Sequence, residues 1–278
     1  MANHHFGALG DVWKHLALAE ILRVRPPRHY WETHAGSAEY PLTESPTRLH
    51  GALRFLARAP GDVDLAGCSY LDALRAAPGV YPGSASLATR ALGDRAEYLF
   101  CDTDPESTLT LRKAGGHLAK RVADEEGVAA IRREAASASL NPADVLVHID
   151  PFDPHERLTP DALTPVALAA DLASRGFRVF YWYGYESIGA RGWAHDEIAR
   201  LSSDTALWCG DVLIPSPFVY PERRGAWGCG VVLANMTDTE TDVCARLGRA
   251  LERMCADDVA PGNIPERLAF DHLRHGVE

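Results

Sequence analysis

The residues in this chain best suited to chemistry are Asp150, Pro151 and Phe152, which directly follow a mostly apolar run over 145–149. Such a run predicts a buried parallel strand, and open α/β sheets bind their ligands at the carboxyl ends of strands. The Asp150 carboxylate and the Pro151 carbonyl could accept hydrogen bonds from an amine, and the Phe152 ring could stack on a flat group. The pattern therefore predicts a site for an amino group on a planar ring. A strand end followed by a proline turn and a core phenylalanine is the simpler interpretation.

The elements that would position these residues alternate along the chain. Strands are predicted at 29–33, 96–101, 144–149 and 178–183, with a short further strand near Val122. Helices are predicted at 11–22, 84–90, 109–118, 163–174, 195–201 and 239–255, and the first of them has the spacing of an amphipathic helix. This alternation implies an α/β fold with a mostly parallel sheet and right-handed crossovers. Segments 205–214 and 229–235 are expected to close the sheet as a strand pair with an antiparallel strand.

The chain is expected to form one domain over 1–278 that contains an insertion. Residues 41–80 contain helical stretches that are interrupted by Pro46, Pro60 and Gly61. Because proline and glycine interrupt helices, this stretch predicts short helices rather than one long one. We expect 41–80 to form a helical insertion subdomain.

Composition narrows the class of protein. The chain has 278 residues, a formal net charge of −10 and a pI of about 5.6, which weighs against a broad nucleic-acid-binding surface. No apolar run approaches the ~18 residues that a membrane span needs, and the start shows no basic-then-apolar leader. The six cysteines form no CxxC pair. These features favour a cytoplasmic chain with free thiols and no membrane partner.

Two further strand ends carry residues that could hold a nucleoside. Gly36 follows the first predicted strand, where the backbone would turn tightly against a ligand, although the usual dinucleotide glycine spacing is missing. Asp102 follows the second, where an acid typically accepts hydrogen bonds from ribose hydroxyls. A surface turn over 102–105 is an equally simple interpretation of Asp102.

Short motifs occur in order along the chain: Gly10-Asp11-Val12-Trp13-Lys14-His15, Thr33-His34-Ala35-Gly36, Tyr81-Pro82-Gly83-Ser84, Asp102-Thr103-Asp104-Pro105, Glu126-Gly127, Ile149-Asp150-Pro151 and Phe180-Tyr181-Trp182-Tyr183. In this order and spacing they resemble the bacterial family that methylates adenine N6 in large-subunit ribosomal RNA with S-adenosylmethionine (SAM). The resemblance covers most of the chain. It implies a Rossmann-like class I SAM-dependent methyltransferase fold, SAM as cofactor and an rRNA-modification role.

The resemblance also implies roles for single residues. The SAM site would be lined by Lys14, His15, His34, Gly36, Ser84, Asp102, Glu126, Gly127 and Asp150. Asp102 would hold the ribose, and Glu126 would accept a hydrogen bond from the cofactor's adenine amine. Asp150, Pro151 and Phe152 would form the catalytic motif, with Asp150 contacting both SAM and the target amine. Lys14 and His15 could instead cap a helix, and His34 could be a core histidine.

The departures from the family gather on the target side of the site. The family motif is Asp-Pro-Pro-aromatic, whereas Phe152 and Asp153 stand in the last two positions here. The family's basic and aromatic amino terminus and its late Asn-Pro-Pro-Trp motif have no counterparts. The residues therefore support the cofactor more strongly than an RNA target. Candidate phosphate contacts are limited to Arg23, Arg25 and Arg28 near the first helix, with His29, and to the pair Arg223-Arg224.

Three classes of function remain open. One is an RNA adenine methyltransferase, and the second is a methyltransferase of a small-molecule or natural-product amine. The third is a SAM-binding relative without catalysis. A metal site is a further alternative because His148 and Asp150 would share one strand face, with Asp153 and His155 nearby, but no further cluster of ligand residues supports it, and we expect no metal.

Overall fold

A computed structural model of the chain describes residues 6–114, 116, 118, 120–137, 139–157, 159–202, 205–215, 226–256 and 268–275, without the side chains of 215, 226 and 227. Its centre is an eight-stranded sheet with the order β10-β8-β9-β7-β6-β1-β4-β5. The strands are β1 (His29–Glu32), β4 (Glu97–Cys101), β5 (Lys120–Ala123), β6 (Val145–Ile149), β7 (Arg178–Tyr185), β8 (Leu207–Pro215), β9 (Ala226–Ala234) and β10 (Ala269–His275).

The sheet is parallel on one side and antiparallel on the other. Strands β5, β4, β1, β6 and β7 pair in parallel, and β9, β8 and β10 continue the sheet in antiparallel pairs. Chain order reverses between β1 and β6, and ligands bind open α/β sheets at such a switch point. This arrangement is the predicted Rossmann-like α/β fold, a mostly parallel sheet with antiparallel strands on one side.

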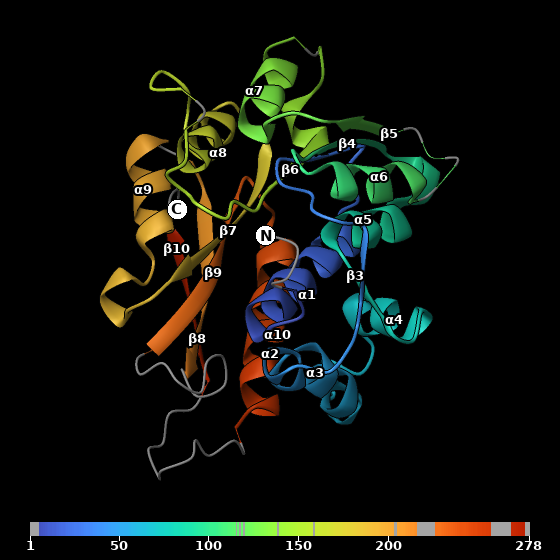
Figure 1. Cartoon of the computed structure of the whole chain (residues 1–278). Helices are drawn as coiled ribbons and strands as arrows, with labels where there is room; N and C mark the ends of the chain where they lie inside the picture. The colour runs from blue at the N-terminus through green and yellow to red at the C-terminus, as the bar shows by residue number, and fades with distance from the viewer. Residues whose placement is uncertain are drawn as a thin grey trace.

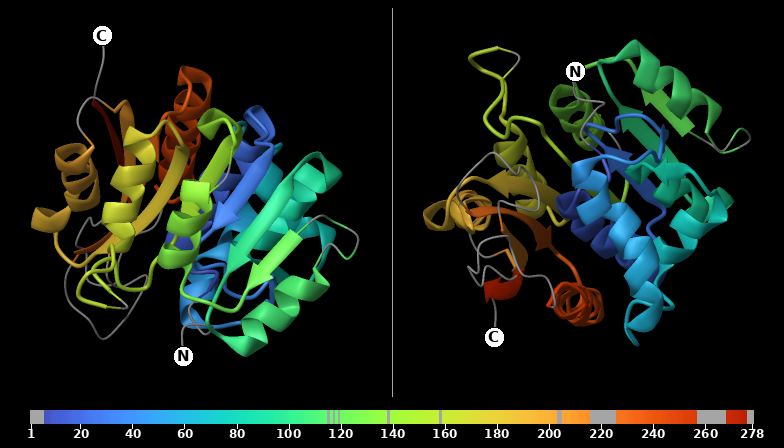
Figure 2. Two further views of the ribbon diagram at one scale, coloured as in Figure 1. Left: turned by 90° about the horizontal axis from the view of Figure 1, so that it is seen from above. Right: turned by 60° about the horizontal axis from the view of Figure 1, so that its bottom comes forward.

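Helices cover both faces of the sheet (Figures 1 and 2). One face packs against α1 (Leu9–Val24), α5 (Ser84–Leu92) and α10 (Asp238–Met254). The other packs against α7 (Gly127–Ser137), α8 (Pro165–Ser174) and α9 (Trp193–Leu201). Side chains alternate between these two cores along each strand, so that Tyr30 of β1 joins the first core and Trp31 joins the second.

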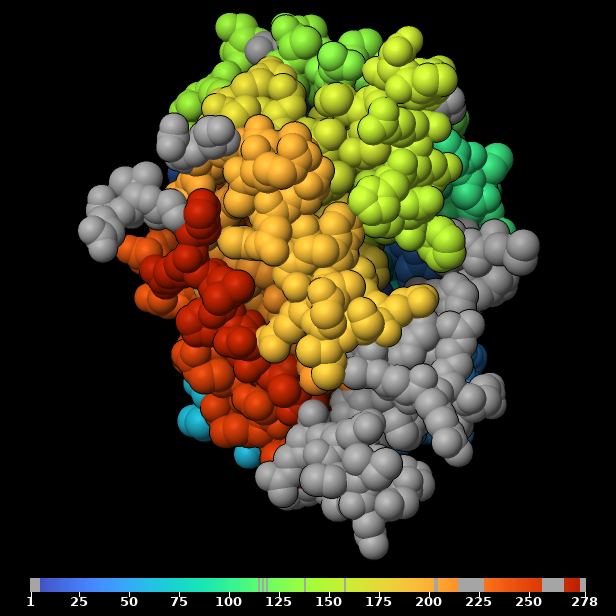
Figure 3. All heavy atoms as spheres, turned by 90° about the vertical axis from the view of Figure 1, so that its left-hand side faces the viewer, coloured from blue at the N-terminus to red at the C-terminus, as the bar shows by residue number. Residues whose placement is uncertain are grey.

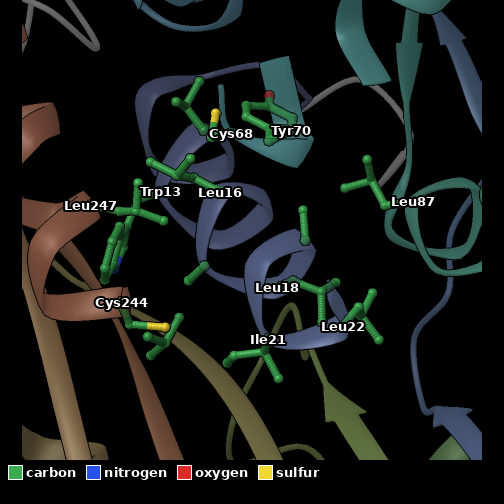
Figure 4. Packing of buried hydrophobic residues seen from close by; sticks show 14 of the residues in the cluster. Trp13, Leu16, Leu18, Ile21, Leu22, Cys68, Tyr70, Leu87, Cys244 and Leu247 are labelled. Carbon is green, nitrogen blue, oxygen red and sulfur yellow. The ribbon is translucent and has the colours of Figure 1, made fainter. Parts of the chain in front are cut away.

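Helix α1 is buried on all sides, which corrects the expected amphipathic helix. Trp13, Leu16 and Ile21 are fully buried, and so are most residues from Leu9 to Leu22, including the charged Lys14 and Glu20. Figure 4 shows apolar side chains of α1 facing the insertion on one side and α10 on the other. The sequence pattern failed because the insertion covers the face that would otherwise meet solvent. The charged residues on that helix must therefore have buried partners.

The segment expected as an insertion begins and ends at a small separate sheet. Strands β2 (Glu39–Pro41) and β3 (Val80–Pro82) pair antiparallel at its base. Between them lie α2 (Pro46–His50), α3 (Ala52–Arg58), a short 3-10 turn and α4 (Ser69–Ala76). Phe55 and Tyr70 are fully buried in the core around α1, which ties the insertion to the main fold.

Several boundaries differ from the sequence prediction. Helix α6 covers Pro105–Lys113 and not 109–118, because Asp104 caps its N-terminus by accepting from Ser107 N–H at 3.0 Å. The uncertain strand near Val122 exists as β5. Helix α7 and the edge strand β10 were not predicted, and Figure 3 shows β10 along the surface beside α9. None of the helices in the described part of the chain has the length and apolar character to cross a membrane.

Candidate active site

The predicted catalytic carboxylate lies where β6 leaves the sheet, next to α1. Asp150 follows Ile149, the last residue of β6, and its Oδ2 lies 2.7 Å from Nζ of Lys14. Lys14 also contacts Oδ1 of Asp11 at 3.2 Å, so one ammonium is shared by two carboxylates. The Lys14 Nζ is 5.3 Å from the centre of the Trp182 ring of β7. The buried lysine of α1 therefore connects the helix to the ends of two strands.

Charge pairing decides the protonation of this triad. Burial alone would raise the pKa of Asp150, but the charge of Lys14 and its hydrogen bond, with a smaller electrostatic contribution from His148, outweigh burial and lower it. The pKa of Asp11 is raised, because burial and the negative Asp150 outweigh the attraction to Lys14. Burial would lower the pKa of Lys14, yet the two carboxylates raise it. Asp150 is therefore held ionised near neutral pH.

Two hydrogen-bond acceptors at this strand end have no partner among the described residues. Oδ1 of Asp150 and the carbonyl of Pro151 accept no hydrogen bond from any residue that the structure describes, whereas Oδ2 is bound by Lys14. Asp150 has 18% of its side chain exposed, and Pro151 is buried. Phe152 is 84% exposed, so it is not the core residue of the simpler interpretation. The motif presents two acceptors and a free aromatic ring.

The loop after β1 is shaped around Gly36 and Asp102. Gly36 has φ +58°, and a Cβ there would come within 2.6 Å of the Tyr40 hydroxyl. Its N–H donates to Oδ2 of Asp102 at 2.8 Å, and the N–H of Asp104 donates to Oδ1 at 2.8 Å. A carboxylate oxygen can accept more than one hydrogen bond, so Asp102 can still receive hydroxyl donors. The Asp102 carboxylate thus stabilises both the loop after β1 and the turn that precedes α6.

Glu126 and Gly127 lie at the start of α7, against the end of β1. The Glu126 carboxylate accepts from the N–H groups of Val128 at 2.7 Å and Ala129 at 2.8 Å, and so caps the helix. A Cβ on Gly127 would lie 1.9 Å from the Thr33 carbonyl oxygen. Only glycine permits this approach of α7 to β1. The predicted adenine contact of Glu126 would have to share its oxygens with the helix cap.

A cavity of about 200 Å³ opens among these strand ends. Its walls are Thr33, His34, Asp102, Thr103, Glu125, Glu126, Gly127, Glu156, Leu163 and Pro165. Of the predicted cofactor residues it thus brings together His34, Asp102, Glu126 and Gly127. Sequence reasoning missed Glu156, which comes from the loop after β6. Small-ligand sites usually have ≈ 300 Å³ or more, so this cavity suits part of a nucleoside cofactor rather than all of it.

The two predicted histidines have different surroundings. His34 borders the cavity, and its Nδ1 lies 2.7 Å from Thr33 Oγ1. Burial lowers its pKa, although Asp150, Glu126, Asp102 and Glu156 act in the opposite sense. His15 Nδ1 lies 2.7 Å from the Tyr81 hydroxyl, and burial together with Lys14 lowers its pKa well below the usual value. His15 is therefore neutral, on the α1 side of the site.

Ser84 lies behind the cavity in a buried polar network. Its hydroxyl donates to Glu32, whose Oε1 is 2.8 Å from Nδ1 of His148. The Tyr30 hydroxyl completes the network, 3.0 Å from His148 Nδ1 and 3.3 Å from Glu32 Oε2. Glu32 and His148 are neighbours in the β1–β6 pairing, which the sequence alone could not show. No group of three metal-ligand residues exists within the described ranges.

The candidate phosphate contacts lie away from this site. Arg23 pairs with Glu20 at 2.6 Å and Arg25 lies 3.6 Å from Glu240, at the carboxyl end of α1. Arg28 precedes β1, so all three are at the opposite edge of the sheet from Asp150, about 13 Å or more away along the strands. Arg223 and Arg224 fall outside the described residues. The three arginines near α1 are therefore too far from Asp150 to bind the phosphates next to a base that occupies this site.

Comparison with known proteins supports the fold. No protein-family model matches the chain, and no curated protein matches it in sequence. A solved structure from Legionella pneumophila, described as protein LPL1258 with the family-model DUF519, has a TM-score of 0.70 and 18% identity. The match covers 97% of this chain and 98% of that chain, so the two share a fold. A SAM-dependent methyltransferase from Agrobacterium tumefaciens has a TM-score of 0.44 and 11% identity over 84% of this chain and 64% of that one, too distant to carry an argument.

Proposed function

We propose that the chain is a SAM-dependent N-methyltransferase that binds an amine acceptor at Asp150 and Pro151. The proposal depends on two acceptors without a partner among the described residues, Asp150 Oδ1 and the Pro151 carbonyl. The Asp150 carboxylate is held ionised by Lys14. An amine with two N–H groups matches two adjacent acceptors. An adenine of ribosomal RNA is the acceptor that the sequence resemblance implies, and a small-molecule amine is the alternative.

The cavity among the strand ends would hold part of a nucleoside cofactor. Asp102 has carboxylate oxygens suited to ribose hydroxyls, and Gly36 and Gly127 remove the side chains that would fill the space around Thr33 and Tyr40. His34 and Glu156 would border the cofactor between this cavity and Asp150. When bound, SAM supplies a methyl group on positively charged sulfur, and its transfer leaves a neutral thioether and a nitrogen that must lose one proton.

The protein's own residues have three tasks in this reaction. Asp150 and Pro151 would orient the amine by accepting its two N–H groups, which favours a lone pair directed at the methyl carbon. Asp150 would also stabilise the positive charge that develops on the nitrogen. Lys14 would fix the carboxylate and keep it ionised. Because the Asp150 pKa is low, its part is electrostatic, and the proton leaves to solvent after transfer.

The test separates cofactor binding from catalysis. Calorimetry with SAM should show binding to the wild type, and label from methyl-labelled SAM should enter cell RNA or a small-molecule extract. Asp150→Asn keeps the shape and removes the charge, so transfer should fall by at least about 100-fold while SAM affinity changes little. Asp171→Asn, on the far half of α8, is the matched control. No SAM binding, or unchanged transfer in Asp150→Asn, contradicts the proposal.

A further inference from the structure

The edge of the sheet that carries the site is strongly acidic. The loops after β4, β5, β6 and β7 contain the carboxylates Asp102, Asp104, Asp124, Glu125, Glu126, Asp150, Asp153, Glu156, Asp161 and Glu186. Within the described parts of these loops, the basic side chains other than histidine are Arg157 and Arg191. RNA binding depends on Lys and Arg side chains that neutralise phosphates. The local charge, like the net charge of −10, opposes a polyanion at this edge.

Two basic groups on this side of the molecule, Lys14 and Arg191, already pair with carboxylates. Lys14 lies between two carboxylates, Asp11 and Asp150, so its positive charge is already compensated within the protein. Arg191 Nη2 lies 3.4 Å from Asp271, and its Nε lies 4.0 Å from the buried Asp211. Among the described residues, the Asp153 carboxylate accepts one hydrogen bond, from the N–H of His155 at 2.9 Å. Asp153 therefore forms no ion pair with any described residue, and Arg157 of the same loop donates to the Pro160 carbonyl at 3.3 Å instead.

Two side chains near Asp153 bear on the kind of ligand that this region could hold. The Phe152 ring, 84% exposed, directly precedes Asp153 and offers a face for a flat or cationic group. The Tyr181 hydroxyl of β7 is fully buried and has no hydrogen-bond partner among the described residues. Burial raises the pKa of Tyr181, and the nearby charges of Asp150 and Asp153 raise it further. A donor without a partner thus lies close to the same two carboxylates.

We infer that the acceptor is a small molecule that carries a positive charge beside a planar ring amine, and that Phe152 and Asp153 select it. The inference rests on the proposed function and specifies its acceptor class. The aromatic amine is uncharged and nucleophilic, and it sits at Asp150 and Pro151. The separate cationic group lies against Phe152 and pairs with Asp153. An RNA would bring phosphates to the same carboxylates.

The test uses three probes with one ring and one amine but different charges. They are para-aminobenzamidine, which is positive, para-aminobenzamide, which is neutral, and para-aminobenzoate, which is negative. With S-adenosylhomocysteine present and at low salt, the amidine should bind about tenfold more tightly than the amide, and the benzoate most weakly. The difference should shrink as salt screens the charges. In Asp153→Asn it should fall to about threefold or less, whereas Glu97→Gln, at the opposite edge of the sheet, should leave it unchanged.

The outcomes distinguish this inference from the proposed function. Absence of SAM binding would defeat the proposed function. If SAM binds but the amidine does not bind at millimolar concentration, is not preferred over the amide, or keeps its preference in Asp153→Asn, the acceptor class is wrong. The methyl label could instead enter cell RNA and be absent from the small molecules that a cation exchanger retains. That result would establish RNA as the acceptor and contradict the inference. Phe152→Ala should weaken binding of the amidine, whereas Leu109→Ala, at another exposed apolar position on α6, should not.

Discussion

Replacing Lys14 by methionine should expose how much the fold depends on one buried charge. The substitution keeps the length of the side chain and leaves the carboxylates of Asp11 and Asp150 without their shared cation. At an effective dielectric of about 20, separations of 3.2 and 2.7 Å correspond to attractions of about 5 and 6 kcal/mol. Burial of the ammonium offsets part of this, so a net loss of about 3–5 kcal/mol in the free energy of unfolding is expected near neutral pH.

The pH dependence of that loss follows from the two carboxylates. In the wild type, the lowered pKa of Asp150 contributes stability above its unfolded value of about 3.9, and this contribution is lost as pH falls below it. The raised pKa of Asp11 acts in the opposite sense, since its contribution is present below the unfolded pKa and is lost as pH rises through the folded one. Without Lys14, burial raises both pKa values. The cost of Lys14→Met should therefore be smaller at about pH 5 than at about pH 8.

Equilibrium urea unfolding at the two pH values measures both effects. Lys113→Met, at an exposed position on α6, is the matched control and should change stability by less than about 0.5 kcal/mol. Adding Asp11→Asn to Lys14→Met removes one uncompensated carboxylate and should restore about 1–3 kcal/mol. A cost below about 1 kcal/mol, or one that is equal at both pH values, would refute the reasoning that this triad is a buried, coupled unit.

Two further substitutions test the cofactor cavity. Asp102→Ala should weaken SAM binding in calorimetry by about 1.5–3 kcal/mol, the scale of hydrogen bonds to a charged group. Asp94→Ala, at the surface, should leave the affinity unchanged. Equal affinities of the two variants would mean that Asp102 only stabilises a turn. Gly127→Ala places a Cβ against the Thr33 carbonyl, so it should lower the free energy of unfolding by about 1–3 kcal/mol and weaken SAM binding. Gly61→Ala, with open space around its Cβ, should be tolerated. Unchanged stability in Gly127→Ala would show that α7 can move away from β1.

The sequence predicted the parallel core well because its signals are local. The apolar run of β6 and the β-forming residues of β7 need no knowledge of the rest of the chain. Strand β10 escaped prediction because it is a half-exposed edge strand with charged and histidine side chains. Helix α7 escaped because its N-terminal cap is a glutamate that accepts from the next turn, not one of the usual small capping residues.

The site was only partly predictable, for a different reason. The ends of the parallel strands meet at one edge, so Asp102 and Asp150 could be expected to lie near each other from strand order alone. Lys14 is 136 positions from Asp150, and nothing local indicates that they pair. The Glu32–His148 contact depends on the register between β1 and β6, and Glu156 reaches the cavity through the path of a loop. Such contacts are set by tertiary packing, which periodicity does not encode.

Helix α1 joins the stability of this protein to its proposed chemistry. Its apolar residues fill the space between the sheet, the insertion and α10 (Figure 4), and Lys14 on the same helix is only 6% exposed. A buried ammonium is tolerated only beside compensating charge, and Asp11 and Asp150 provide it. The same burial strengthens the hold of Lys14 on Asp150, since the attraction is weakly screened. In the proposed function, this buried ion pair would keep the Asp150 carboxylate ionised and fixed at the end of β6.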